Sequence, residues 1–100
     1  PDPKARQIDW APNDVMLHYF QQLQEQESKR ALCYILALLM IRRRIFKLEV
    51  SETDDQGREV LIVYCPRNEN EYRVLVETPD AEQITALQEE LAQMLFAQAH

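Results

Sequence analysis

The run from Ala31 to Ile41 is the feature that most restricts how this chain can fold. It reads Ala-Leu-Cys-Tyr-Ile-Leu-Ala-Leu-Leu-Met-Ile, and its only polar group is the hydroxyl of Tyr34. Most of its residues favour helices, and eleven residues is long for a strand. A helix that is apolar around its whole circumference has to be covered on most sides. We therefore expect a central core helix from Ser28 to about Arg44, with the rest of the chain packed around it.

The charges on either side of this run argue against a membrane span. Two cations precede it, and three arginines follow it: Arg42, Arg43 and Arg44. The apolar stretch is therefore much shorter than the roughly 20 residues that a span needs, and we expect no membrane association. We expect Ser28 to cap the helix. The arginines should lie in its last turn, where cations favour the negative end of the helix dipole.

The composition indicates one globular domain. A chain of 100 residues can bury one real core, and 46% hydrophobic with 28% charged residues is ordinary for such a domain. The formal net charge of −6 argues against a dedicated nucleic-acid binder, which is usually basic. Two cysteines without a signal peptide indicate a reducing compartment, so we expect a cytoplasmic protein. Because the chain begins with Pro1 and not Met, we expect a processed or truncated form.

The N-terminal part should contain an arm and a first helix. Residues 1–12 are expected to form an irregular arm and residues 13–100 a single domain. Trp10 in the arm is a candidate lid on the core or a partner-binding group. Asn13 is a plausible N-cap, and an amphipathic stripe then predicts a helix to about Glu27. We expect a break near Glu27-Ser28, although one continuous helix is an open alternative because no Gly or Pro intervenes.

From residue 46 the period of the apolar residues changes to two, which is typical of strands. The alternation predicts strands over Phe46–Ser51 and Tyr72–Glu77, on either side of a more apolar strand over Glu59–Cys65. Pro79 is expected at the first position of a last helix that runs to about Gln98. The prediction is an α+β fold: two N-terminal helices, a three-stranded antiparallel meander and a C-terminal helix.

Both faces of the central strand are apolar, so the prediction of a binding surface depends on which face meets the helices. We expect the helix side to carry the set of Val60, Ile62 and Tyr64. The far side would then carry Leu61, Val63, Cys65 and Leu75 within a charged rim, which is an interface signature. The alternative is that a helix covers this face as well.

The run Tyr34-Ile35-Leu36-Ala37-Leu38-Leu39 is followed by three arginines, and the run Val60-Leu61-Ile62-Val63-Tyr64-Cys65-Pro66-Arg67 by a terminal Leu-rich helix. Together these motifs resemble a family of small, uncharacterised bacterial proteins. The resemblance covers Asn13 to Phe96. It implies a bacterial intracellular protein, and it implies no activity and no catalytic residue.

Residue types that carry catalysis or bind metals are few and are not spaced as such sites require. The soft ligands are Cys33, Cys65, His18 and His100, and none share a zinc-type spacing. Cys65 with His18 is the only formal nucleophile and base, and no local signature supports this pair. The single Gly57 excludes a phosphate-cradling loop. We therefore expect no enzyme, no catalytic residue, no metal site and no cofactor.

The leading hypothesis is a non-catalytic protein-interaction or self-associating module, with a protein partner or a homo-oligomer. Its candidate residues are Trp10, Leu61, Val63 and Leu75. The alternative is a nucleic-acid accessory protein that binds phosphate through Arg42, Arg43 and Arg44. The acidic balance and the lack of interleaved aromatics disfavour this alternative, so we expect no nucleic-acid partner. A secretion-chaperone-like binder is a further alternative, by fold-level analogy alone.

Overall fold

The computed structural model describes residues 12–97. The elements in chain order are α2 (Asn13–Gln24), the 3-10 helix η1 (Glu27–Lys29), α3 (Arg30–Arg42), β1 (Lys47–Thr53), β2 (Glu59–Cys65), β3 (Asn70–Leu75) and α4 (Ala81–Ala97). The strands form one antiparallel sheet in the order β1-β2-β3. The α+β prediction and the meander are therefore confirmed. Trp10 and the rest of the predicted arm up to residue 11 lie outside the described residues.

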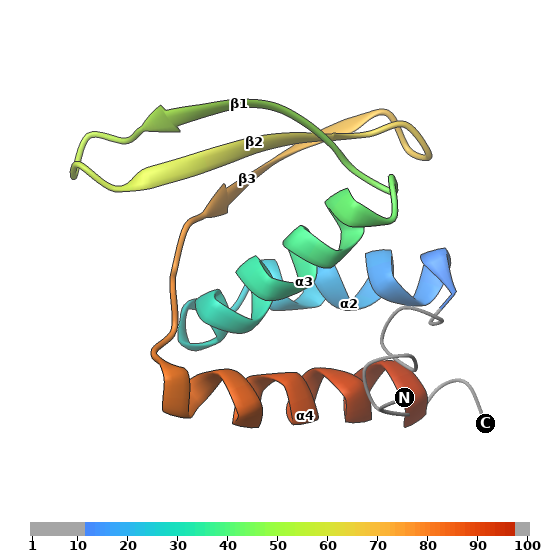
Figure 1. Ribbon diagram of the computed structural model, residues 1–100. Helices are drawn as coiled ribbons and strands as arrows, with labels where there is room; N and C mark the ends of the chain where they lie inside the picture. Colours follow the sequence, from blue (N-terminus) through green and yellow to red (C-terminus); the bar gives the residue numbers. More distant parts are fainter. Residues whose placement is uncertain (1–11, 98–100) are drawn as a thin grey trace.

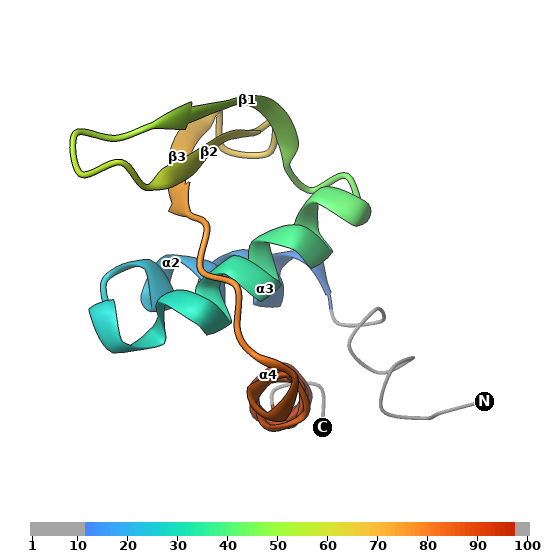
Figure 2. The same cartoon turned by 60° about the vertical axis from the view of Figure 1, so that its left-hand side comes forward.

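The described elements form three layers (Figure 1). The sheet is one outer layer, α2 and α3 lie side by side beneath it, and α4 is the other outer layer. The second view agrees, with α4 seen end-on below α3 (Figure 2). All the helices lie on one side of the sheet. The central helix α3 contacts α2, α4 and β3, so it is the element around which the others pack, as its composition predicts.

The predicted break between the first two helices is confirmed. Gln26 has an extended backbone, with φ −114° and ψ 106°, and η1 follows it. The N-cap of α3 is Lys29 and not Ser28, which lies inside η1, so the predicted cap is wrong. Lys29 instead joins the start of α3 to the outer layer, because its Nζ lies 2.7 Å from Oε1 of Glu90 on α4.

The end of α3 falls earlier than predicted, and only Arg42 belongs to its last turn. Arg43 is the C-cap, and Arg44 has a left-handed backbone with φ 62°. Ile45 and Phe46 then donate their backbone N–H groups to the carbonyl oxygen of Met40, at 2.9 and 3.2 Å. These two bonds close the helix and turn the chain into the sheet, so Arg43 and Arg44 belong to a turn.

An aromatic cluster joins α2 to the sheet. The ring of Phe20 packs edge-on against Phe46 at 4.8 Å and against Tyr72 of β3 at 5.2 Å, measured between ring centroids. The hydroxyl of Tyr72 accepts hydrogen bonds from Gln21 Nε2 at 3.0 Å and from Asn68 Nδ2 at 2.8 Å. The partial burial of Tyr72 therefore leaves its hydroxyl with hydrogen-bond partners, as a buried tyrosine requires.

The predicted assignment of the two sheet faces is wrong. Val63 lies opposite Tyr72 and Leu61 opposite Val74, and residues opposite each other in an antiparallel pair share a face. The core beneath the sheet contains Leu61, Val63, Cys65 and Val74. The face that meets the helices is therefore the one expected to be free. Val60, Ile62 and Tyr64 point to the outer side, where the register also places Leu75.

The outer face is covered by long side chains and not by another element of residues 12–97 (Figures 1 and 2). Arg73 of β3 and Glu52 of β1 form an ion pair across β2, with Nη1 and Oε1 at 2.6 Å. Arg73 lies opposite Ile62, and Glu52 lies opposite Val60. Their aliphatic stems cross the central strand, which explains why Ile62 and Val60 are only 9% and 5% exposed.

Strand β1 contains a bulge between Leu48 and Val50, which places these two residues on opposite faces. Leu48 lies opposite Val63 on the helix side, and Val50 lies opposite Ile62 on the outer side. The alternation of β1 predicted a single apolar face. The extra residue of the bulge changes that parity, and no local feature of the sequence announces it.

Polar side chains fix the connection between β1 and β2 and the start of α4. Oδ1 of Asp54 accepts the backbone N–H groups of Gln56 and Arg58, and Gly57 takes φ 81°. Asp80 and Gln83 exchange side-chain to backbone hydrogen bonds of 2.9 and 3.2 Å, which is a capping box. Pro79 therefore precedes α4, and the prediction that it occupies the first helical position is wrong.

Candidate protein-interaction surface

Among the residues that the structure describes, the central helix is covered on three sides and open on the fourth. The buried residues of α3 are Leu32, Cys33, Leu36, Ala37 and Met40. Leu38 is 42% exposed although it lies in the middle of the most apolar segment of the chain. The sheet lies above α3, α4 below it and α2 behind it, so the remaining side of α3 faces the viewer in Figure 1. At 100° per residue Leu38 lies opposite the fully buried Leu36 and Met40, so its exposure marks a side of α3 that the core does not cover.

The open side of α3 carries a continuous apolar stripe. On a helix of 3.6 residues per turn, Tyr34, Ile35 and Ile41 lie within roughly 60° of Leu38. All three are only partly buried. No charged residue occurs from Ala31 to Ile41, whereas the solvent side of a surface helix is normally charged or polar. This side of α3 therefore has the composition of a core, although Leu38 is exposed and its apolar neighbours are only partly buried.

Two further large apolar residues are exposed, one on the sheet and one on α4. Leu48 is 51% exposed and lies on the helix side of β1, at the edge of the sheet that the helices do not reach. Ile84 is 39% exposed and lies one turn before Leu87, on the side of α4 that packs against the core. We call the stripe of Tyr34, Ile35, Leu38 and Ile41 the α3 open face.

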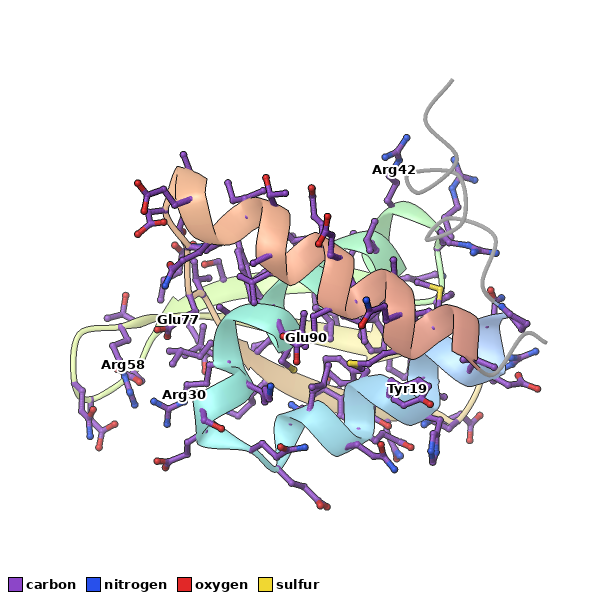
Figure 3. The ribbon with its side chains drawn as sticks, turned by 90° about the horizontal axis from the view of Figure 1, so that it is seen from below. Tyr19, Arg30, Arg42, Arg58, Glu77 and Glu90 are labelled. Carbon is purple, nitrogen blue, oxygen red and sulfur yellow. The ribbon has the colours of Figure 1, made fainter. Side chains whose placement is uncertain are left out.

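Charges of opposite sign lie at the two ends of the α3 open face. Arg42 ends α3 and points away from the helical layers (Figure 3). Asp80 and Glu82 lie at the start of α4, at the end of the molecule where α3 begins (Figure 1). The cations at this end, Lys29 and Arg30, are paired with Glu90 and Glu27, so the balance of charge there is acidic. The open face is therefore an apolar strip with a basic end and an acidic end, which fits a surface that binds a protein.

The structure separates the other predicted interaction residues. Leu61 and Val63 are 8% and 0% exposed and lie in the core between sheet and helices, so they form no accessible surface. Leu75 is half-buried on the outer face of the sheet. The three arginines diverge, because Arg43 Nη1 donates to Sδ of Met16 on α2 at 3.7 Å, away from the open face.

Leu38 was not among the candidate residues, and the sequence contains a signal for it. Buried helix positions recur on one side of α3, and Leu38 falls opposite Leu36 and Met40 at 100° per residue. A helix that is apolar all round needs partners on every side, and the predicted fold offered only a sheet and two helices. Counting the available partners would have indicated that one side lacks a cover.

The outer face of the sheet contains a polar hollow. It has a volume of about 490 Å³ and is lined by Glu49, Val50, Glu52, Ile62, Glu71 and Arg73. A hydrogen bond between the two carboxyl groups of Glu49 and Glu71, from the two edge strands, raises the pKa of Glu49. The hollow is shallow, and an ion pair spans its floor. It has neither the enclosure nor the convergent donors of a small-molecule site.

The cysteines lack the features of a nucleophile. Cys33 and Cys65 are both free and buried. Burial raises the pKa of the Cys33 thiol to about 12, so it stays protonated and unreactive at neutral pH. The side chain of His18 is exposed and pairs with Gln22 at 3.1 Å on the surface of α2. Across residues 12–97, no three His, Cys, Asp or Glu side chains group as metal ligands would.

No helix within the described part of the chain combines the length and the apolar character needed to cross a membrane. Comparison of the chain with protein-family models, with curated proteins and with solved structures finds no match in any of the three.

Proposed function

We propose that the protein is a non-catalytic protein-interaction module and that the α3 open face is its binding surface. The observation that carries this proposal is the 42% exposure of Leu38 on a side of α3 that has no charge for three turns. Exposed apolar strips with polar rims mark protein-binding sites on soluble domains. The free, buried state of both cysteines supports a reducing compartment such as the cytoplasm.

The arrangement of the core supports a binding role for this strip. Leu36 and Leu38 are two residues apart in the same helix, yet Leu36 is fully buried and Leu38 is 42% exposed. The core therefore uses one side of α3 fully and leaves a large part of Leu38 in solvent. A partner that covers this apolar surface would account for a leucine at an exposed helix position.

The nucleic-acid alternative receives no support from the position of the arginines. A phosphate site needs cations that converge on one surface. Arg43 turns back to α2, while Arg42 lies at the end of an apolar strip. The net charge of −6 also repels the phosphates of a nucleic acid at long range.

The proposal is tested by photo-crosslinking in cells that contain the native partner set. A benzophenone amino acid replaces Ile41, in the α3 open face, and in a matched control it replaces Val50, which is 50% exposed on the outer face of the sheet. We expect a discrete adduct, identified by mass spectrometry, from position 41 and not from position 50. Adding Leu38→Glu should abolish that adduct, because a charge on the strip opposes docking.

The outcome that overturns the proposal is equally specific. If position 41 yields no adduct, or if its adduct survives Leu38→Glu, the α3 open face is not a binding surface. Circular dichroism of the purified Leu38→Glu variant serves as the control for folding. Because Leu38 is 42% exposed, a glutamate at this position can reach solvent, and the variant should keep the helical signal and the melting temperature of the parent to within a few degrees.

A further inference from the structure

We infer that the occupant of the α3 open face is a second copy of this chain, with the two α3 helices antiparallel and Leu38 on the two-fold axis. This inference rests on the proposed function and names its partner. Within residues 12–97 of one copy, the sheet, α2 and α4 cover three sides of α3. A second α3 packed on the fourth side would supply the missing apolar neighbour. In a two-fold dimer the same face of each copy is buried by the other.

The spacing of residues along α3 is self-complementary about Leu38. Tyr34 lies four residues before Leu38, and Arg42 lies four residues after it. A two-fold axis through Leu38 therefore sets Tyr34 of one copy against Arg42 of the other, and this happens twice. A guanidinium over a tyrosine ring is a favourable cation–π pair. By the same symmetry Ile35 meets Ile41, so apolar residues face apolar residues.

The charges at the rim favour the same orientation. Arg42 marks the basic end of the α3 open face, and Asp80 and Glu82 at the start of α4 mark its acidic end. An antiparallel two-fold brings the basic end of each copy onto the acidic end of the other. A parallel arrangement would place Arg42 against Arg42 and the acids against each other, which is repulsive. Charge complementarity therefore selects the antiparallel dimer.

The edges of the sheet are poorer places for a second copy. The free edge of β1 is interrupted by the bulge between Leu48 and Val50, and bulges prevent regular pairing with another strand. On the other edge, the carbonyl oxygen of Arg73 accepts a hydrogen bond from Gln24 Nε2 at 2.9 Å. A side chain of α2 thus already uses the backbone that a new strand would need. Association by helix packing is the alternative that remains.

Disulfide trapping of the purified full chain tests the inference. A residue on a two-fold axis lies opposite itself, so Leu38→Cys should give a covalent dimer under mild oxidation. Val50→Cys is the matched control, because Val50 is similarly exposed but lies on the outer face of the sheet, and it should stay monomeric. The native thiols do not interfere, since Cys33 and Cys65 are 6% and 0% exposed.

A mixture of two single variants tests the orientation. When Tyr34→Cys and Arg42→Cys are mixed and oxidised, the antiparallel dimer predicts the mixed disulfide in clear excess over both symmetric ones. The two variants differ in mass, so mass spectrometry separates the three products. An excess of the symmetric products would indicate parallel helices and overturn the inference.

The result also separates this inference from the proposed function. If Leu38→Cys gives no more covalent dimer than Val50→Cys, a second copy does not occupy the α3 open face and the inference fails. The proposed function then still stands or falls with the adduct at position 41 in cells. An adduct of the protein with itself supports both, whereas an adduct with a different protein supports only the proposed function.

Discussion

Replacing Val63 and Val50 separately by alanine tests which face of the sheet packs on the helices. Both residues are valines in neighbouring strands, but Val63 is fully buried and Val50 is 50% exposed. Val63→Ala removes the equivalent of two methylene groups, and each contributes about 0.8 kcal/mol of transfer free energy when buried. With the cavity left behind, the free energy of unfolding should fall by about 2–3 kcal/mol. Val50→Ala removes the same atoms from a half-exposed site, so it should cost less than about 1 kcal/mol.

Urea denaturation at fixed pH measures both free energies of unfolding from the midpoint, provided that the m-value is unchanged. For a domain of this size, the Val63→Ala loss corresponds to a fall of roughly 10–20 °C in melting temperature. The two variants lose the same intrinsic strand propensity, so their difference reports burial alone. Equal losses, or a larger loss for Val50→Ala, would refute the placement of Val63 in the core.

Three further predictions concern single sites. Leu36→Asp buries an unpaired charge in the centre of α3, so circular dichroism should show an unfolded chain. Gly57→Ala should lower the free energy of unfolding by about 1 kcal/mol in urea denaturation, because its φ of 81° disfavours any side chain. Glu71 holds the pKa of Glu49 above its ordinary value, so both carboxylates repel once pH exceeds that pKa. Glu49→Gln should therefore raise the melting temperature at pH 7 and have no such effect near pH 4.

The fold could be predicted from the sequence wherever one physical pattern dominates. Strand β2 begins and ends at the predicted residues, Glu59 and Cys65, because a dense run of β-branched and apolar residues lies between turn residues. The break before α3 followed from the need to fold the stripe of α2 onto the core. The helix caps were harder to predict, since Ser28 and Pro79 have suitable residue types but Ser28 lies inside η1 and Asp80 caps α4 together with Gln83.

The sheet faces could not be predicted because the register is set by contacts across strands. Both parities of β2 are apolar, so its own pattern does not say which side is buried. The four-residue turn after Cys65 sets Val63 opposite Tyr72, and the bulge in β1 sets Leu48 and Val50 on different sides. Because of these features, the residues predicted on the outer face of the sheet lie on the helix side, and those predicted on the helix side lie outside. The predicted interaction residues Leu61 and Val63 are therefore buried.

The candidate surface followed only in part from the sequence. The apolar circumference of α3 and the lack of partners for one side were both visible in the chain. The choice of side required the positions of α2, α4 and the sheet, which depend on packing between distant segments such as Lys29 with Glu90. The prediction of a protein-binding strip thus stays a proposal, with its location moved from Val63 to Leu38.

The mass of the purified chain in solution tests the central claim most directly. Light scattering on the parent, Leu38→Glu and Val50→Glu at equal concentrations compares a charge on the α3 open face with a charge on the outer face of the sheet. We predict a mass of two chains for the parent and for Val50→Glu, and of one folded chain for Leu38→Glu. A parent with the mass of one chain at every concentration, or a Leu38→Glu variant that keeps the mass of two, would contradict the claim.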